Sequence, residues 1–188
     1  MSFLLKTLIV FFLSASSVFA QTIADLSKAI AVDHNNGNAY TKRGVAYAKM
    51  GNLTDAISDL TQAIEINPKD AIAYYLRGTI YYTQGIPAQA VSDFTQAIVI
   101  NPKVAKGYFS RALTYLREDR SDEAVADLSM VVGINPKYAR AYYDRAVAYY
   151  QLKQYDKAWA DVRMFQKLTP HQETGNFPDF IAALKKAK

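Results

Sequence analysis

The chain has 188 residues and a formal net charge of +5, with 51% hydrophobic and 21% charged residues. This composition fits one folded domain with a substantial core and argues against disorder. The chain contains no cysteine, which excludes disulfides, thiolate zinc sites and cysteine nucleophiles. The positive charge is too small to indicate nucleic-acid binding by itself.

Residues 1–20 differ in character from the rest of the chain. Lys6 precedes an apolar run from Leu8 to Leu13, and the segment ends in Val18-Phe19-Ala20. A basic start, a short apolar core and small or β-branched residues just before a cut are typical of a secretory signal peptide. We therefore predict that residues 1–20 are removed by cleavage after Ala20.

This prediction sets the expected location of the protein. The mature chain is expected to be exported, to the periplasm first and to the medium as the alternative. An uncleaved N-terminal anchor is the competing interpretation of the same segment. Because the apolar run is short for a membrane-spanning helix, the mature chain is not expected to span a membrane.

The remainder of the chain repeats every 34 residues. Pro68, Pro102, Pro136 and Pro170 are evenly spaced, and the first three lie in identical Asn-Pro-Lys triplets. Proline cannot continue a helix and disfavours helical geometry in the residue before it, so each Asn-Pro closes one unit. This periodicity predicts one supersecondary unit repeated along the chain. The complete units are residues 37–70, 71–104, 105–138 and 139–172.

Each unit contains two amphipathic runs that predict two helices. Bulky and small residues alternate at positions 4, 8 and 11 of the unit, the spacing of one helical face. A large ring on one helix requires a small residue opposite it if the helices are to approach closely. The position-4 tyrosines and position-8 small residues are Tyr40, Tyr74, Tyr108, Tyr142 and Gly44, Gly78, Ala112, Ala146. The turns at Gly51 and Gly85 have favourable sequences, whereas those at Asp119 and Lys153 are less typical.

The array is predicted to end differently on its two sides. Residues 21–36 align with the second half of the first complete unit, so they are expected to form a half unit consisting of a second helix without its first. Leu26 and Ala29 would then form an uncovered apolar edge, through which the chain could dimerise. If residues 1–20 are retained, we expect them to lie over this edge. Residues 173–188 are predicted to include a capping helix with Phe180, Ile181 and Leu184 facing inward.

An arginine and an aspartate also recur every 34 residues. The arginines are Arg43, Arg77, Arg111 and Arg145, and the aspartates are Asp25, Asp59, Asp93, Asp127 and Asp161. Each arginine lies 18 residues after one aspartate and 16 before the next, which predicts an alternating ladder along the stacked helices. An anion-binding stripe is the alternative. We favour a structural role because a ligand site is local, whereas this feature repeats in every unit, and buried ion pairs help to set register. Each arginine is therefore expected to contact an aspartate of its own or the preceding unit.

The sequence gives no indication of catalysis. His34 and His171 are the only histidines and lie at opposite ends of the array, so they cannot share a metal or a proton relay. No nucleophile with a nearby base and no glycine-rich phosphate loop occurs. We therefore predict no catalytic, metal or cofactor site and no enzymatic activity.

The 34-residue pattern resembles the tetratricopeptide repeat, since Tyr40, Gly44, Tyr47, Ala56, Leu60 and Pro68 match the family in the first unit. The resemblance covers residues 37–170 and departs from the family in placing arginine, rather than leucine, at position 7. It implies an all-α fold, a right-handed α-solenoid of helix-turn-helix repeats with a C-terminal capping helix. With the signal peptide, it suggests an exported bacterial member of the family. It also implies a non-catalytic scaffold that binds a peptide or partner domain in a concave groove.

The resemblance also implies where that groove lies. In this family, positions 5, 9 and 12 of each first helix face the groove, and their spacing places them on one stripe. The stripe begins with the small residues Thr41, Val45 and Ala48, and basic residues such as Lys42 and Lys49 surround it. An apolar floor with a basic rim suits a segment with apolar anchors and acidic flanks. The alternative is that these rings only cover the inner surface of the array. The predicted partner-binding residues are Tyr75, Thr79, Tyr82, Lys106, Phe109, Leu113, Leu116, Arg117, Arg140, Tyr143, Val147 and Tyr150.

Other functions of repeat arrays fit the sequence less well. The family's clamp for C-terminal carboxylates is absent, because the matching positions keep only one basic residue of five, either Lys106 or Arg140. RNA recognition is disfavoured by the strict 34-residue period, the export signal and the mild charge. A structural or assembly component of an envelope complex, acting through homo-oligomerisation, remains the main alternative.

Overall fold

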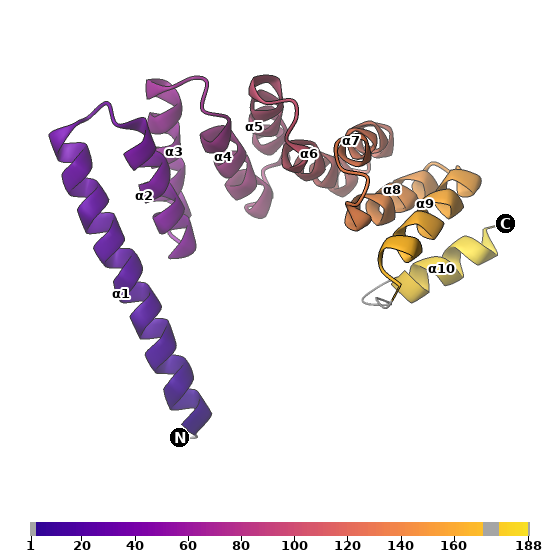
Figure 1. Ribbon diagram of the computed structural model, residues 1–188, viewed down its shortest axis with the longest axis horizontal. Helices are drawn as coiled ribbons and strands as arrows, with labels where there is room; N and C mark the ends of the chain where they lie inside the picture. Colours follow the sequence, from indigo (N-terminus) through magenta and orange to yellow (C-terminus); the bar gives the residue numbers. More distant parts are fainter. Residues whose placement is uncertain (1–2, 171–176, 188) are drawn as a thin grey trace. The chain divides into compact units, whose positions relative to one another are not determined.

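The computed structural model describes residues 3–170 and 177–187, with side chains from Ser17 onward. Within this part of the chain every regular element is a helix (Figure 1). The fold is therefore all-α, as predicted. The helices are α1 (Phe3–Val32), α2 (Gly37–Lys49), α3 (Leu53–Ile66), α4 (Ala71–Thr83), α5 (Pro87–Ile100), α6 (Ala105–Arg117), α7 (Ser121–Ile134), α8 (Ala139–Gln151), α9 (Tyr155–Leu168) and α10 (Phe177–Lys186). Helices α2 to α9 supply two helices to each complete 34-residue unit.

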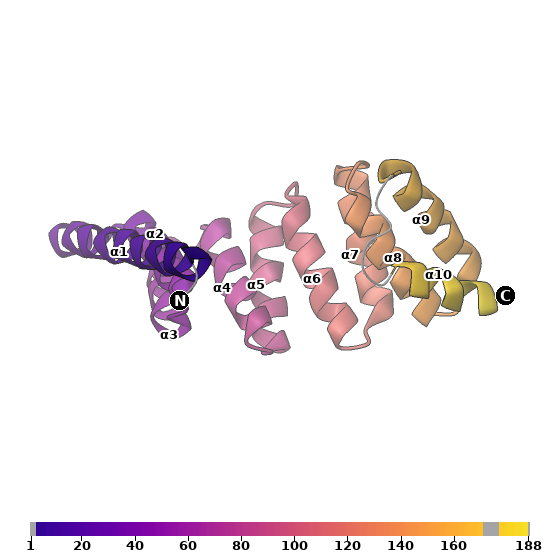
Figure 2. The same ribbon diagram turned by 90° about the horizontal axis from the view of Figure 1, so that it is seen from below.

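The chain divides into two compact units, residues 1–89 and 90–188. In the first, α1 packs on α2, α2 on α3 and α3 on α4. In the second, α6, α7, α8 and α9 pack in the same successive manner (Figure 2). Each inner helix therefore buries one face against its predecessor and another against its successor, as a repeat array requires.

The Asn-Pro pairs end the second helix of a unit through backbone geometry. Asn67 and Asn135 both have extended backbones, with φ near −131° and −134°. Their side-chain oxygens accept hydrogen bonds from the amides of Lys69 and Lys137, each at 3.1 Å. This local turn replaces the next helical hydrogen bond, and the following proline prevents the helix from continuing.

The turn inside each unit has one left-handed residue at the same place. Gly51 and Gly85 have φ of 79° and 72°, and the equivalent Asp119 and Lys153 have 56° and 59°. The less typical turn sequences therefore adopt the same turn as the glycine-containing ones. Residues with a side chain do so at a backbone cost of about 1 kcal/mol.

Small residues at position 8 allow the two helices of a unit to approach closely. A Cβ atom added to Gly44 would lie 3.1 Å from Leu60 Cγ and 3.2 Å from the Ala56 carbonyl oxygen. The equivalent Ala112 and Ala146 are fully buried. The alternation of large and small residues thus packs as the sequence indicates.

The repeated arginine binds an aspartate and a hydroxyl group in the first, third and fourth complete units. Arg43 donates from Nε and Nη2 to the two carboxylate oxygens of Asp59, both at 2.8 Å, and from Nη1 to Ser27 Oγ at 2.9 Å. We call this set an arginine staple: an arginine, the aspartate 16 residues later and the hydroxyl 16 residues earlier. The same contacts join Arg111 with Asp127 and Thr95, and Arg145 with Asp161 and Ser129. Arg77 makes the equivalent bond to Thr61 Oγ1 at 2.9 Å.

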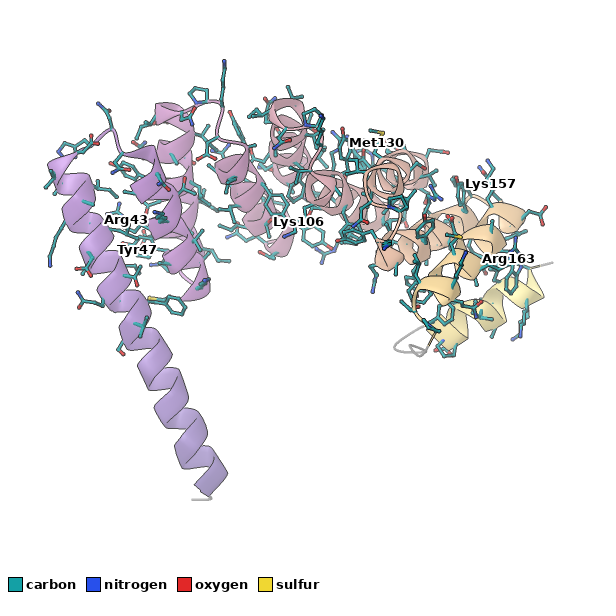
Figure 3. All side chains as sticks on the ribbon, in the orientation of Figure 1. Arg43, Tyr47, Lys106, Met130, Lys157 and Arg163 are labelled. Carbon is teal, nitrogen blue, oxygen red and sulfur yellow. The ribbon has the colours of Figure 1, made fainter. Side chains whose placement is uncertain are left out.

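The surroundings of the staple hold the guanidinium group in one orientation. Ser27 Oγ donates its own proton to the Ile23 carbonyl, so only its lone pairs remain for Arg43. The guanidinium carbon of Arg43 lies 5.5 Å from the ring centre of Tyr40 and 5.9 Å from that of Tyr47. Figure 3 labels Arg43 and Tyr47. The hydrogen bonds to aspartate raise the pKa of Arg43, Arg111 and Arg145 above the ordinary arginine value, and burial opposes this. These arginines thus remain charged within the packed interface.

The staple confirms the predicted arginine–aspartate contact in three units. The predicted alternating ladder of arginine and aspartate needs a correction. The aspartate partner always belongs to the arginine's own unit. The preceding unit contributes a hydroxyl group in place of an aspartate, because Ser27, Thr61, Thr95 and Ser129 lie two residues beyond each aspartate on the second helix. Asp25 instead bonds to Gln21 and Lys28 within its own helix.

Helix α1 corrects a second prediction. Residues 1–20 were expected to fold over the edge formed by residues 21–36, but residues 3–32 form one continuous helix that extends past the end of α2 (Figure 1). A segment that continues a straight helix cannot also lie against its side. Among the described residues, no helix combines the length and the apolar character needed to cross a bilayer.

The staple makes a testable prediction about stability. In the Arg111–Asp127 pair the arginine side chain is 17% exposed and the aspartate 6%. Arg111→Met therefore leaves a buried carboxylate without its cation and should lower the free energy of unfolding by about 3 kcal/mol. Adding Asp127→Leu removes that carboxylate and should recover part of the loss. Urea denaturation followed by circular dichroism measures both variants.

Arg120→Met is the matched control, because its pair with Glu123 is exposed. It should lower the free energy of unfolding by about 1 kcal/mol or less. An Arg111→Met loss no larger than the control loss, or a double variant less stable than Arg111→Met, would contradict the proposed role of the staple.

Candidate functional site

An open groove of about 770 Å³ lies in the first compact unit, between α1, α2 and α4. Its lining residues come from α2, the start of α4 and the second half of α1. They are Phe19, Thr22, Asp25, Leu26, Asn38, Thr41, Lys42, Val45, Ala46, Lys49, Asp70, Ile72 and Leu76. No other helix contributes to this groove.

The groove has an apolar floor and a basic rim. Val45 and Leu76 face it from α2 and α4, and Leu26 faces it from α1. Lys42 and Lys49 are exposed at its edge, and Lys49 Nζ lies 5.5 Å from the ring centre of Phe19. Such a surface can bury apolar side chains of a ligand while it attracts acidic groups beside them.

The acidic residues of the groove have different roles. Asp70 accepts hydrogen bonds from the amides of Ile72 and Ala73, each at 3.0 Å, and from Thr41 Oγ1 at 3.3 Å. Its charge caps the N-terminus of α4 and ties that end to α2. Asp25 is the other acid of the lining, and its side chain is 59% exposed. The available charge at the groove is thus that of two lysines and Asp25.

The first compact unit contains part of the predicted binding stripe. Thr41 and Val45, at positions 5 and 9 of the first unit, line the groove as their positions indicate. Tyr75, Thr79 and Tyr82 lie half-buried on α4 outside the groove lining. Helix α4 contributes Ile72 and Leu76 instead.

Several lining residues of the groove lie outside the predicted stripe. Ile72 and Leu76 are four residues apart, at positions 2 and 6 of a first helix, so a stripe next to the predicted one could have revealed them. The contributions of Leu26 and Asp25 follow from the half unit that α1 supplies. The half unit has no first helix, so the residues of α1 that would contact it could have been predicted to line an open surface.

On α6, the predicted residues divide into core and surface. Phe109 and Leu116 pack against the core cluster that includes Leu128 and Val131, and the Phe109 ring centre lies 5.0 Å from that of Tyr138. Leu113 is half-buried, whereas Lys106 (Figure 3) and Arg117 are exposed. Phe109 and Leu116 therefore stabilise the repeat, and the exposed cations remain candidates for partner contact.

On α8, the chain's own capping helix covers the predicted residues. The Tyr143 ring centre lies 5.9 Å from that of Phe177 and 5.7 Å from that of Phe180. The Tyr150 ring centre lies 5.8 Å from that of Phe180. Half-buried Val147 lies between these two tyrosines on the same helix. In this structure α10 therefore packs on the face of α8 that carries these predicted residues.

A buried carboxylate on α8 engages another predicted rim residue. Arg140 Nε donates to both carboxylate oxygens of Asp144, each at 2.9 Å. Burial raises the pKa of Asp144 above its ordinary value, and the hydrogen bond from Arg140 partly offsets this. The guanidinium carbon of Arg140 also lies 5.1 Å from the ring centre of Tyr143. Arg140 is therefore held in place by its neighbours.

The described side chains form no group of three or more histidine, aspartate and glutamate residues that could hold a metal ion. His34 is exposed in the turn after α1, and His171 lies outside the described residues.

These observations define a class of helical repeat protein. Its helix pairs have a fixed length, Asn-Pro ends a pair, and a groove lies between the helices. Sequence models of the tetratricopeptide repeat match residues 71–104 and 109–173, and a model described as TPR repeat matches residues 46–85. The chain belongs to the tetratricopeptide repeat family. No curated protein sequence matches it significantly.

Solved structures show the same α-solenoid fold. A crystal structure of MamA is 25% identical over 81% of this chain and 89% of its own, with a TM-score of 0.77. YrrB, a TPR protein with an unusual peptide-binding site, is 21% identical over 86% of this chain and 83% of its own, with a TM-score of 0.74. The first TPR of Spaghetti (RPAP3), bound to the HSP90 peptide SRMEEVD, is 23% identical over 63% of this chain and 93% of its own, with a TM-score of 0.59.

The capping helix makes the second testable prediction. Phe180→Ala removes the ring that contacts both Tyr143 and Tyr150 and should weaken the docking of α10 by about 2 kcal/mol. Amide hydrogen exchange should become faster throughout α10 while the amides of α6 keep their rates. Ala182→Gln, an exposed change on the same helix, should leave α10 protected. Equal protection of α10 in both variants would show that the rings do not hold it.

Proposed function

We propose that the protein is a non-catalytic interaction scaffold that binds a peptide or a partner domain. The proposed principal site is the groove between α1, α2 and α4, because it is open and large enough to accept part of a peptide. Tetratricopeptide arrays generally recognise proteins and have no chemistry of their own, which supports the assignment.

The chemistry of the groove favours a particular kind of ligand. Val45 and Leu76 offer an apolar floor, and Lys42 and Lys49 offer positive charge at the rim. A peptide that places a bulky apolar anchor on the floor and acidic residues beside it would satisfy both features. The exposed Lys106 and Arg117 on α6 would favour acidic partners in the second compact unit in the same way.

Two of the similar structures support peptide binding as the activity. YrrB has an unusual peptide-binding site, and the first TPR of Spaghetti (RPAP3) holds a peptide that contains two glutamates and an aspartate. Because the carboxylate clamp is absent from this chain, recognition here would rest on the groove floor and the two lysines.

A role as an assembly component is the second candidate function. It is favoured by the face of α1 that carries Leu26 and Ala29, because these residues are only half-buried although the equivalent Leu60 and Ala63 of α3 are fully buried. A second copy that covered this face would form a dimer through residues 21–36.

We also propose that the chain is exported and that residues 1–20 are removed. The support is the charge and apolar pattern of that segment. Removal would leave the Ser27–Arg43 bond and the buried Ile30 in place and would lose the Phe19–Lys49 contact. Mass spectrometry of the protein from separated cell fractions should find a chain that begins at Gln21 outside the cytoplasm. An intact chain that begins at Met1 in the membrane fraction would assign the segment to an anchor instead.

The groove makes a testable prediction about binding. Val45→Glu places a carboxylate on the apolar floor next to Lys42. The free energy of peptide binding should therefore become less favourable by about 2 kcal/mol. Val45 lies outside the core cluster of the first compact unit, so the thermal midpoint should change little. The measurement is titration calorimetry with peptides selected from a random display library on the full chain.

Val99→Glu is the matched control, because Val99 is an exposed valine on α5 outside the groove lining. It should leave every selected peptide bound with unchanged affinity. Peptides that bind Val45→Glu as tightly as the unaltered chain would place the binding surface elsewhere.

A further inference from the structure

In each complete unit, the second helix has a face that packs against the first helix of the same unit. Helix α1 has the residues of such a face but no first helix packed on it. Asp25, Leu26 and Ala29 are equivalent to Asp59, Leu60 and Ala63 of α3. In α3 all three are buried, whereas in α1 the leucine and alanine are half-buried and the aspartate is exposed. The side chain of Asp25 is 59% exposed, compared with 7% for Asp59.

The complete units show what normally covers such a face. A first helix places its arginine on the aspartate through two hydrogen bonds of 2.7–2.8 Å. A glycine or alanine follows the arginine and allows close approach, as at Gly44 and Ala112. Tyrosines three residues before and four residues after the arginine flank the guanidinium group, as Tyr40 and Tyr47 flank Arg43.

Asp25 has no arginine partner among the described residues. It accepts one hydrogen bond from Gln21 at 3.0 Å and lies 3.6 Å from Lys28 Nζ, and both partners are on the same exposed helix face. Exposed pairs of this kind contribute little, so an arginine that offers a bidentate bond would replace them at small cost. Asp25 and Leu26 also line the groove, so a helix seated on α1 would lie beside Lys42 and Lys49.

We propose that this face of α1 and the adjoining groove dock one amphipathic helix of a partner protein. The helix carries an arginine that binds Asp25, with aromatic residues three positions before and four positions after it and a glycine or alanine directly after it. This inference rests on the proposed function, since it names the ligand of the same groove. The partner helix takes the place of the missing first helix of the half unit.

Among the described helices, the chain itself offers none that is suitable. Residues 3–20 continue α1 and cannot turn back onto it. Arg43, Arg111 and Arg145 already bind aspartates of their own units, and Arg77 of α4 is bonded to Thr61. Helix α10 contains no arginine. The other helical arginines, Arg117, Arg140 and Arg163, lack aromatic residues three positions before and four positions after them. A second folded copy could therefore not supply an arginine in this pattern without first breaking one of its own staple contacts.

The test uses a synthetic peptide with the sequence of residues 37–50. Gly37–Lys49 form α2, which packs on α3 as the first helix of its unit. The peptide is capped at both ends, labelled with fluorescein and titrated against the full chain by fluorescence anisotropy. We expect saturable binding of one peptide per chain. Asp25→Asn in the chain should weaken binding by about tenfold or more, because one bidentate charged pair is lost. Replacing the peptide's arginine by lysine should have a similar effect, since lysine cannot form the fork.

Glu65→Gln is the matched control in the chain, because it removes one exposed carboxylate of α3 that lies outside the groove lining. It should leave the affinity unchanged. Absence of saturable binding, or binding that Asp25→Asn does not alter, would overturn the inference. A full chain that dimerises in analytical ultracentrifugation, and becomes monomeric with Leu26→Asp, would assign the face to a second copy and would also overturn it.

The outcomes separate this inference from the proposed function. Library peptides that bind the unaltered chain, lose affinity with Val45→Glu and ignore Asp25→Asn would keep the groove as a binding site and reject the arginine-bearing helix. Library peptides that ignore Val45→Glu would reject the groove, whatever Asp25 does.

Discussion

A charged arginine within a packed helical interface constrains this molecule more than any other single contact. Its carboxylate partner is almost fully buried, so the pair is tolerated only when the guanidinium group is held in one geometry. The two oxygens of the aspartate, the lone pair of a hydroxyl and the flanking rings provide that geometry. Because the hydroxyl belongs to the preceding helix, one arginine sets the register of three successive helices. Apolar packing alone would permit small slips along the helix axes.

The same constraint explains the two ends of the array. At the C-terminal end, α10 docks through Phe177, Phe180 and Leu184 and carries no arginine, so the array closes there on an apolar contact. At the N-terminal end, α1 keeps the aspartate and the leucine of a second helix and lacks its cover. The two ends therefore differ in what they can accept, and the groove lies at the end that remains open.

Much of the fold could be predicted from the sequence, because a repeat array makes each contact between neighbours and repeats it at a fixed spacing. The helix pairs, the small residue at position 8 and the arginine–aspartate contact are all visible as 34-residue periodicities. The hydroxyl partner was missed although Ser27 and Thr61 follow the same period, because serine and threonine resemble ordinary surface residues. The candidate site was predicted less well. Whether Tyr143 is open or covered depends on α10, which stands outside the period, and the wall formed by α1 exists only because the first unit is incomplete.

Proton exchange at the arginine Nε–H groups tests the role of the staple most directly. NMR can follow this exchange for each arginine in the intact protein. Because Arg43, Arg111 and Arg145 donate Nε–H to buried aspartates, their Nε protons should exchange much more slowly than that of Arg120, whose glutamate partner is exposed. Exchange at those three arginines as fast as at Arg120 would contradict the account, because the guanidinium groups would then be leaving the interface freely.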